Sequence, residues 1–198
     1  MPKLIIYAGI NGAGKTTLCN FHEIHENFEI VNADMILVEE GGDWKSKIDQ
    51  IRAGKETLRR IKQDLAQNKS FSIETTRLST FALNTAIKAK EKNYEVILNF
   101  IGVESLETAL QRIEKRVQLG GHGIDKEVVK IRFKRQYEGL SQLISVCDKS
   151  FLYDNRDQLS LIGVFFEGNI LYINKNIDWL KNFYENEHLS YLMNRENL

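Results

Sequence analysis

The sequence predicts an α/β fold of three layers, with a mostly parallel central sheet and a helical lid. Segments typical of strands and of helices alternate along the 198 residues, which favours a parallel sheet covered by helices on both faces. Residues 9–16 read Gly-Ile-Asn-Gly-Ala-Gly-Lys-Thr, between the apolar run Leu4–Ala8 and a helical stretch. This strand–loop–helix context is the one that a phosphate-binding G-x-x-x-x-G-K-[ST] loop requires. Together the observations predict a P-loop NTPase fold.

The first half of the chain supplies three expected strands, 3–9, 28–33 and 70–74, and three expected helices, 15–25, 47–68 and 79–92. The first strand and helix are the two segments that flank the glycine-rich loop. The helix over 47–68 is indicated by apolar residues at helical spacing, which we expect to face the core. These residues are Ile48, Ile51, Leu58, Ile61 and Leu65.

In the second half we expect strands over 94–101, 149–153, 160–166 and 170–173, and helices over 105–119, 125–146 and 177–186. The run Tyr94–Phe100 and the aromatic, β-branched residues 164–166 are typical of strands. Glu167-Gly168-Asn169 has the composition of a hairpin turn between the last two strands. The chain has one proline and shows no repeat or linker, so we expect a single domain, 1–198, with its lid at about 105–146.

Composition limits the partners and the compartment. The 27 basic and 27 acidic residues balance, so no net charge favours nucleic acid or an anionic membrane. Cys19 and Cys147 are isolated, in neither a disulfide pattern nor a metal-ligand spacing. The chain begins directly with a strand pattern and has no apolar run of membrane length. We expect a cytoplasmic protein without nucleic-acid or membrane partners.

The glycine-rich loop predicts that the chain binds a nucleoside triphosphate. Its glycines allow a tight turn in which backbone N–H groups point at phosphates, and the helix that follows adds its positive end. Lys15 can reach the β- and γ-phosphates, and the Thr16 hydroxyl can hold Mg²⁺. The alternative is a glycine-rich turn with an incidental Lys-Thr pair. The expected nucleotide-binding residues are Gly9, Asn11, Gly12, Ala13, Gly14, Lys15, Thr16 and Thr17.

Two carboxylates follow expected strands, at the edge of the sheet where ligands bind. Asp34 can take a proton from an attacking hydroxyl, hold Mg²⁺, or merely cap the helix from Met35 onward. Glu74 can be an acidic residue of Walker-B type, an acceptor for sugar or nucleoside hydroxyls, or part of a polar loop. The strand over 94–101 ends without an acidic residue, which favours a small-molecule kinase over a motor ATPase.

A basic segment brackets the glycines at 120–123 and predicts a helix–turn–helix lid. Cations on such a lid can neutralise charge on a transferring phosphoryl group, although a charge run is more often a solvated face. His122 can cap a helix, touch nucleotide or face water. The basic residues are Arg112, Lys115, Arg116, Lys126, Lys130, Arg132, Lys134 and Arg135.

An ordered set of motifs resembles the zeta-toxin-like family of P-loop kinases, in the short branch of predicted ATPases. The set comprises the loop 9–18, Val31-Asn32-Ala33-Asp34, Phe71–Thr76, Arg116-Val117 followed by Gly120-Gly121-His122 and Arg132, and Tyr153-Asp154-Asn155. The resemblance spans about residues 3–175 and implies a P-loop kinase that moves a γ-phosphate from ATP or GTP to a small hydroxyl compound. Zeta toxins act on UDP-N-acetylglucosamine and are countered by an antitoxin protein.

Residue by residue, the resemblance makes Asp34 the catalytic base and Lys15 with Thr16 the phosphate and metal ligands. It places Glu74, with Thr75, at the acceptor, and Arg116 and Arg132 on the γ-phosphate. Arg112 or Arg135 can take the roles of these lid arginines instead. The alternatives are a kinase for another small hydroxyl compound, such as a nucleoside, sugar or antibiotic, and a non-catalytic nucleotide-binding switch.

Overall fold

The computed structural model describes residues 1–21, 28–156, 158–174 and 176–186. Its described residues form a seven-stranded sheet in the order β2-β3-β1-β4-β5-β6-β7. The pairs β2·β3, β3·β1, β1·β4 and β4·β5 are parallel, and β6 and β7 complete the sheet in antiparallel fashion. The strands are β1 (Lys3–Ala8), β2 (Glu29–Val31), β3 (Phe71–Thr75), β4 (Glu95–Gly102), β5 (Lys149–Asp154), β6 (Ser160–Phe166) and β7 (Asn169–Ile173).

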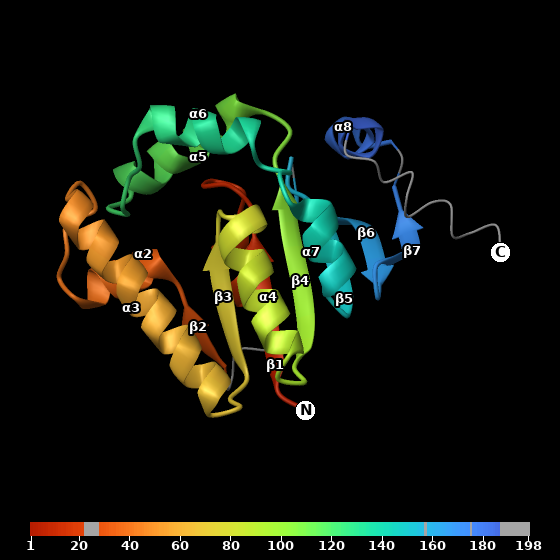
Figure 1. The fold of residues 1–198 in the computed structure, drawn as a ribbon. Helices are drawn as coiled ribbons and strands as arrows, with labels where there is room; N and C mark the ends of the chain where they lie inside the picture. Colours follow the sequence, from red (N-terminus) through yellow and green to blue (C-terminus); the bar gives the residue numbers. More distant parts are fainter. Residues whose placement is uncertain (22–27, 157, 175, 187–198) are drawn as a thin grey trace.

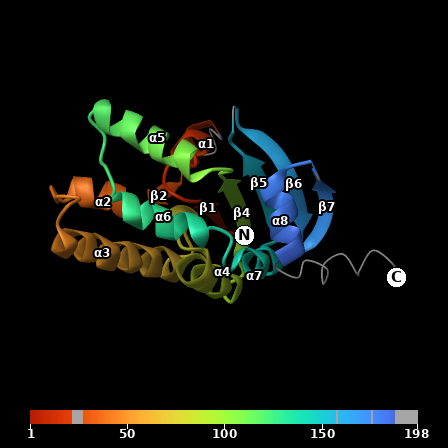
Figure 2. The same cartoon turned by 90° about the horizontal axis from the view of Figure 1, so that it is seen from above.

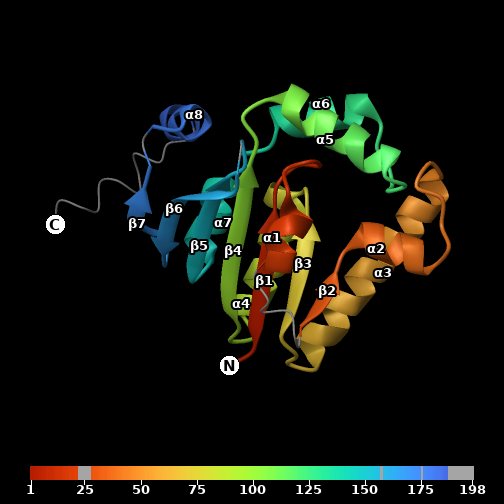
Figure 3. The same cartoon turned by 180° about the vertical axis from the view of Figure 1, so that it is seen from behind.

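Helices cover both faces of this sheet (Figures 1 and 3). Apolar side chains of α3, α4, α7 and α8 pack in one core cluster, whereas those of α1, α5 and α6 pack in another. The helices are α1 (Lys15–Phe21), α2 (Ala33–Glu39), α3 (Lys47–Ala66), the π-helical turn η2 (Leu78–Ala82), α4 (Leu83–Lys90), α5 (Leu106–Gln118), α6 (Lys126–Lys134), α7 (Leu140–Val146) and α8 (Asp178–Asn186).

The expected α/β class, the mostly parallel sheet and all seven expected strands are confirmed. The hairpin turn between β6 and β7 is also confirmed, with positive φ angles of 48° at Glu167 and 77° at Gly168. Two positive φ angles in succession give the backbone twist that joins two adjacent antiparallel strands. Of the helix expected over 15–25, residues 22–25 lie outside the described part of the chain.

Three helix predictions need correction. The helix expected over 125–146 is two helices, α6 and α7, because Gly139 adopts a left-handed φ of 85° between them. Only α6 belongs to the lid, since α7 packs with α4 and β4. Helix α2 was not among the expected helices. It begins after Asn32, whose side chain accepts from the backbone N–H of Asp34 at 2.7 Å, so Asp34 is not the cap.

The expected core stripe of α3 is wrong for three of its five residues. Ile61 and Leu65 are buried, whereas Ile48, Ile51 and Leu58 are 77%, 59% and 48% exposed. The buried face of the helix runs instead through Ala53, Thr57 and Asp64. Only the second half of α3 therefore presents large apolar residues to the sheet.

The lid lies above the carboxyl ends of the parallel strands. Figure 1 shows α5 and α6 over this edge, and Figure 2, from above, shows them side by side, with α5 on the side of α1 and α6 on the side of α3. Because parallel strands gather their carboxyl ends at one edge, the loop after β1, the start of α2 and the end of β3 lie beneath this lid.

Candidate active site

The loop between β1 and α1 has the geometry of a phosphate-binding loop. Gly9, Gly12 and Gly14 have φ angles of 147°, 80° and 100°, a region that other residues rarely adopt. A Cβ on Gly9 would collide with the backbone carbonyl of Ile101, so glycine is also required there by space. Asn11 and Ala13 are buried, whereas Thr16 and Thr17 are exposed at the start of α1.

Lys15, Thr16 and Glu74 meet beside this loop. The Lys15 side chain is 7% exposed, and its ammonium group donates to the carbonyl of Ile10 at 3.0 Å and lies 3.7 Å from a Glu74 carboxylate oxygen. The Thr16 hydroxyl donates to the other Glu74 oxygen at 3.3 Å. Burial lowers the pKa of Lys15, while the negative charges of Glu74 and Asp34 oppose that shift. The end of β3 therefore supplies a carboxylate to the loop after β1.

Asp34 reaches the same site from the first turn of α2. Its Oδ2 lies 3.1 Å from Nε2 of His122, in the turn between α5 and α6. The hydrogen bond from His122 is the main cause that lowers the pKa of Asp34. The positive charges of Lys15 and Arg116 lower it further, and burial opposes them. The carboxylate is thus ionised at neutral pH, the form that can accept a proton.

Two of the lid arginines face the loop. Arg132 on α6 donates to the Asn11 side chain at 2.6 Å, which ties the lid to the loop. Burial lowers the pKa of Arg132, and the charge of Asp34 opposes this shift. Nε and Nη2 of Arg116 on α5 are buried and have no hydrogen-bond partner within the described ranges. The Arg116 charge acts on both Lys15 and Asp34.

The other two candidate arginines have different contacts. Arg112 donates to the backbone carbonyls of Gly12, Asn155 and Arg156, at 3.4, 2.6 and 3.0 Å. Arg135 is exposed and pairs with Glu138 on the same segment. The structure therefore brings together Lys15, Asp34, Arg116 and Arg132, and it engages Arg112 in backbone contacts.

Thr75 contacts backbone N–H groups instead of the charged side chains of this cluster. It is 8% exposed, its hydroxyl accepts from the backbone N–H of Arg77 at 2.9 Å, and its carbonyl accepts from the N–H of Gly9 at 3.3 Å. These contacts shape the turn after β3 and join it to the loop.

Sequence reasoning left His122 unassigned and gave Asn155 no role of its own. The Asn155 side chain donates to the carbonyl of Ala13 at 2.8 Å, so the segment after β5 supports the loop. The only signals in the sequence were the motifs Gly120-Gly121-His122 and Tyr153-Asp154-Asn155, and neither names the contact that its residue makes.

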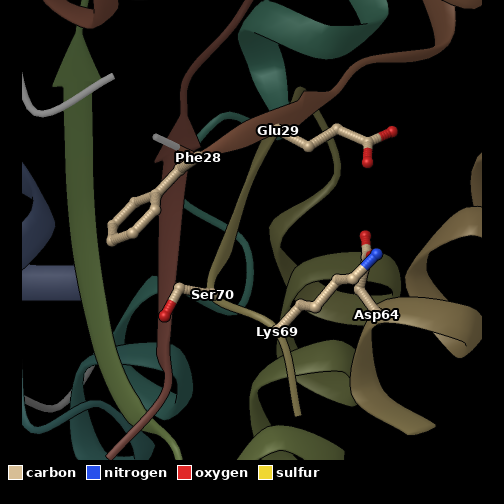
Figure 4. Close-up of a pocket in the computed structure, with 5 residues that line it drawn as sticks. All are labelled: Phe28, Glu29, Asp64, Lys69 and Ser70. Atoms are coloured by element: carbon tan, nitrogen blue, oxygen red, sulfur yellow. The ribbon is translucent and has the colours of Figure 1, made fainter. Parts of the chain in front are cut away.

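A separate open pocket of about 360 Å³ lies at the opposite edge of the sheet, where β2 and β3 begin. Figure 4 shows its lining residues, Phe28, Glu29, Asp64, Lys69 and Ser70. Asp64 is 4% exposed, and burial raises the pKa of its carboxyl group. This pocket shares no residue with the cluster beneath the lid.

A membrane-spanning helix is not found within the described ranges, where every helix is too short or too polar to cross a bilayer.

No family model matches the chain. An uncharacterized protein of Haemophilus influenzae is 31% identical over 131 residues, which cover 66% of this chain and 92% of that protein. The chain belongs to the family of this Haemophilus protein.

Solved structures show the fold. A crystal structure of AvrRxo1-ORF1:AvrRxo1-ORF2 with sulphate ions superposes with a TM-score of 0.70 at 17% identity, over 92% of this chain. This chain spans only 63% of that protein's chain. A structure of the PezAT chromosomal toxin-antitoxin system of Streptococcus pneumoniae gives a TM-score of 0.59 at 19% identity, over 98% of this chain and 88% of that chain. At the level of the fold, the resemblance to zeta-toxin-like P-loop kinases is confirmed.

Proposed function

We propose that the protein is a phosphotransferase that moves the γ-phosphate of a nucleoside triphosphate to a hydroxyl group of a small molecule. The main support for this proposal is the environment of the Arg116 guanidinium group. Its two buried guanidinium nitrogens have no partner within the described part of the chain, and its charge acts on Lys15. Buried polar nitrogens without partners are costly, so an anionic ligand between lid and loop explains why these two are tolerated.

The contacts give each residue a proposed role. The Asp34 carboxylate takes the proton of the acceptor hydroxyl. The acceptor oxygen bonds to the γ-phosphorus, and the bond between the γ-phosphorus and the oxygen of the β-phosphate breaks. Lys15, Arg116 and Arg132 neutralise the charge that develops on the transferring group and on the leaving nucleoside diphosphate. Backbone N–H groups of the loop hold the phosphates, except those of Gly9 and Ala13, which donate to the carbonyls of Thr75 and Ile10.

The side chains at Thr16 fit a divalent metal ion. Mg²⁺ prefers oxygen ligands, and the Thr16 hydroxyl and the Glu74 carboxylate lie within hydrogen-bond distance of each other beside Lys15. We propose that Thr16, supported by Glu74, would hold Mg²⁺, which when bound neutralises phosphate charge. A second proposed role for Glu74, with Thr75, is to bind the acceptor, and the variant Glu74→Gln separates the two roles.

The nucleotide and the acceptor follow from the resemblance. We propose ATP or GTP as the phosphate donor, and an AvrRxo1-ORF1:-ORF2 structure of the same fold contains ATP. UDP-N-acetylglucosamine is the proposed acceptor, because zeta toxins use it. A protein antitoxin is a further proposed partner, since PezAT is a toxin-antitoxin system.

A transfer assay tests the proposal. The protein is incubated with Mg²⁺ and ATP or GTP, together with UDP-N-acetylglucosamine or with a panel of nucleosides, sugars and antibiotics, and products are read by mass spectrometry. A mass gain of one phosphate on an acceptor, absent in Lys15→Ala, supports the proposal. Transfer to another panel member replaces the acceptor but keeps the reaction. Tight nucleotide binding with no turnover would instead favour the nucleotide-binding switch.

A further inference from the structure

The turn between α5 and α6 is shaped to bring its histidine to α2. Gly120 has a φ angle of 84°, and the N–H of Gly121 donates to the carbonyl of Arg116 at 2.9 Å. A Cβ on Gly121 would lie 2.7 Å from Cγ of Arg116, and one on Gly123 would lie 3.1 Å from the Trp44 ring. The glycines on both sides of His122 therefore let the turn pack closely on its own helix and on the segment that follows α2.

Within this turn, His122 contacts Asp34. The two side chains are 31% and 54% exposed, and Nε2 and Oδ2 are 3.1 Å apart. An ionised carboxylate can only accept a hydrogen bond, so the proton must lie on Nε2 of His122. The other charged groups that act on Asp34 are Lys15 from α1 and Arg116 from α5, and Asp34 in turn acts on Arg132 from α6.

We propose that His122 is a positioning residue, which holds the Asp34 carboxylate in its base orientation when the lid turn is docked on the α2–α3 segment. The proposal rests on the proposed function, because it gives Asp34 the role of base. Closure of the lid would then orient the catalytic base, because His122 belongs to the lid whereas Asp34 lies on α2, outside the lid.

The structure distinguishes the positioning of Asp34 from a contact that only holds the lid in place. Arg132 already fastens α6 to the loop through Asn11, and Gly123 packs on Trp44. His122 adds a donor on the carboxylate, and this hydrogen bond is the main cause that lowers the pKa of Asp34. Its removal must therefore raise that pKa, whereas loss of a mere fastening contact would leave the titration of Asp34 unchanged.

The test compares His122→Ala, His122→Asn and the control Glu114→Ala, an exposed position on α5 of the lid. Two quantities are measured: the pH titration of the Asp34 carboxyl carbon by NMR in the nucleotide-free protein, and the pH profile of kcat for phosphate transfer. Misplacement of a catalytic group by about 1 Å can cost about 10²-fold in rate. We expect a loss of that order in His122→Ala, together with shifts of the Asp34 titration and the acid limb of kcat to higher pH.

His122→Asn retains an N–H donor and should recover part of both effects, and Glu114→Ala should show neither. In a double-mutant cycle with Asp34→Asn, His122→Ala should cost little more, because both changes remove the same function. An unchanged Asp34 titration in His122→Ala, or a faster transfer in that variant, overturns the inference. A shifted titration without phosphate transfer by the wild type supports the contact and overturns the proposed function instead.

Discussion

Replacement of Arg116 by methionine is the sharpest test of a ligand beneath the lid. Methionine keeps an unbranched apolar stem against Gly121 but removes the guanidinium group. The Nε and Nη2 atoms are both buried and have no partner within the described ranges, so two charge-assisted hydrogen bonds to phosphate are available. At roughly 1.5–3 kcal/mol each, they sum to about 3–6 kcal/mol. Since about 1.4 kcal/mol is a tenfold rate change, kcat should fall about 10²–10⁴-fold.

In the absence of ligand, Arg116→Met should not lower the thermal stability of the protein. Removal of these two buried nitrogens breaks no hydrogen bond of the described residues, so Tm without ligand should stay constant or rise. The stabilisation that excess nucleotide gives the wild type should shrink by about the binding free energy that is lost, because it depends on the logarithm of the affinity. Kinetics and thermal unfolding are measured beside Arg135→Met, whose arginine is exposed and paired with Glu138. Equal kcat in the two variants would refute a role for Arg116 at the phosphate.

The other predictions concern the loop and the two carboxylates. Lys15→Ala should abolish turnover and weaken nucleotide binding without a loss of fold, as read by ADP release, calorimetry and circular dichroism. Arg132→Met should lower kcat more than it raises the nucleotide KM, because an arginine on the transferring phosphate can raise kcat about 10³-fold or more. A change in KM alone would mean that Arg132 binds only the ground state of the nucleotide. Asp34→Asn should keep acceptor and nucleotide affinity but lose about 10²–10⁴-fold in single-turnover transfer, whereas loss of Mg²⁺-dependent nucleotide binding would make Asp34 a metal ligand. Glu74→Gln should weaken Mg²⁺-dependent nucleotide binding if Glu74 supports the metal, and acceptor binding alone if it holds the acceptor.

The sheet could be predicted from the sequence because its information is local. Each strand is a short apolar or β-branched run between polar segments, and the loop motif fixes where the first strand ends. The helices were harder, because periodicity does not say where tertiary contacts begin. Ile48 and Ile51 have helical spacing, yet that end of α3 extends beyond the core. The break between α6 and α7 depends on one left-handed glycine, Gly139, in a region of continuous helical pattern.

The candidate site could be predicted in its loop and less well in its lid. The spacing of Arg112 and Arg116 places both on one face of α5, but only the folded chain shows that Arg112 contacts backbone carbonyls while two nitrogens of Arg116 have no partner in the described residues. The contact between His122 and Asp34 joins residues 88 positions apart. No local pattern encodes such a pair, because it depends on how the lid packs over α2.

Direct observation of the transferred phosphate tests the central claim. ATP labelled in its γ-phosphate is incubated with wild-type protein, Mg²⁺ and UDP-N-acetylglucosamine or the acceptor panel, and the fate of the label is followed by mass spectrometry. We predict that the label appears covalently on an acceptor hydroxyl, and that Lys15→Ala and Asp34→Asn abolish its appearance. A label that stays on ATP with every acceptor, although the protein binds ATP tightly, would contradict the assignment of a phosphotransferase.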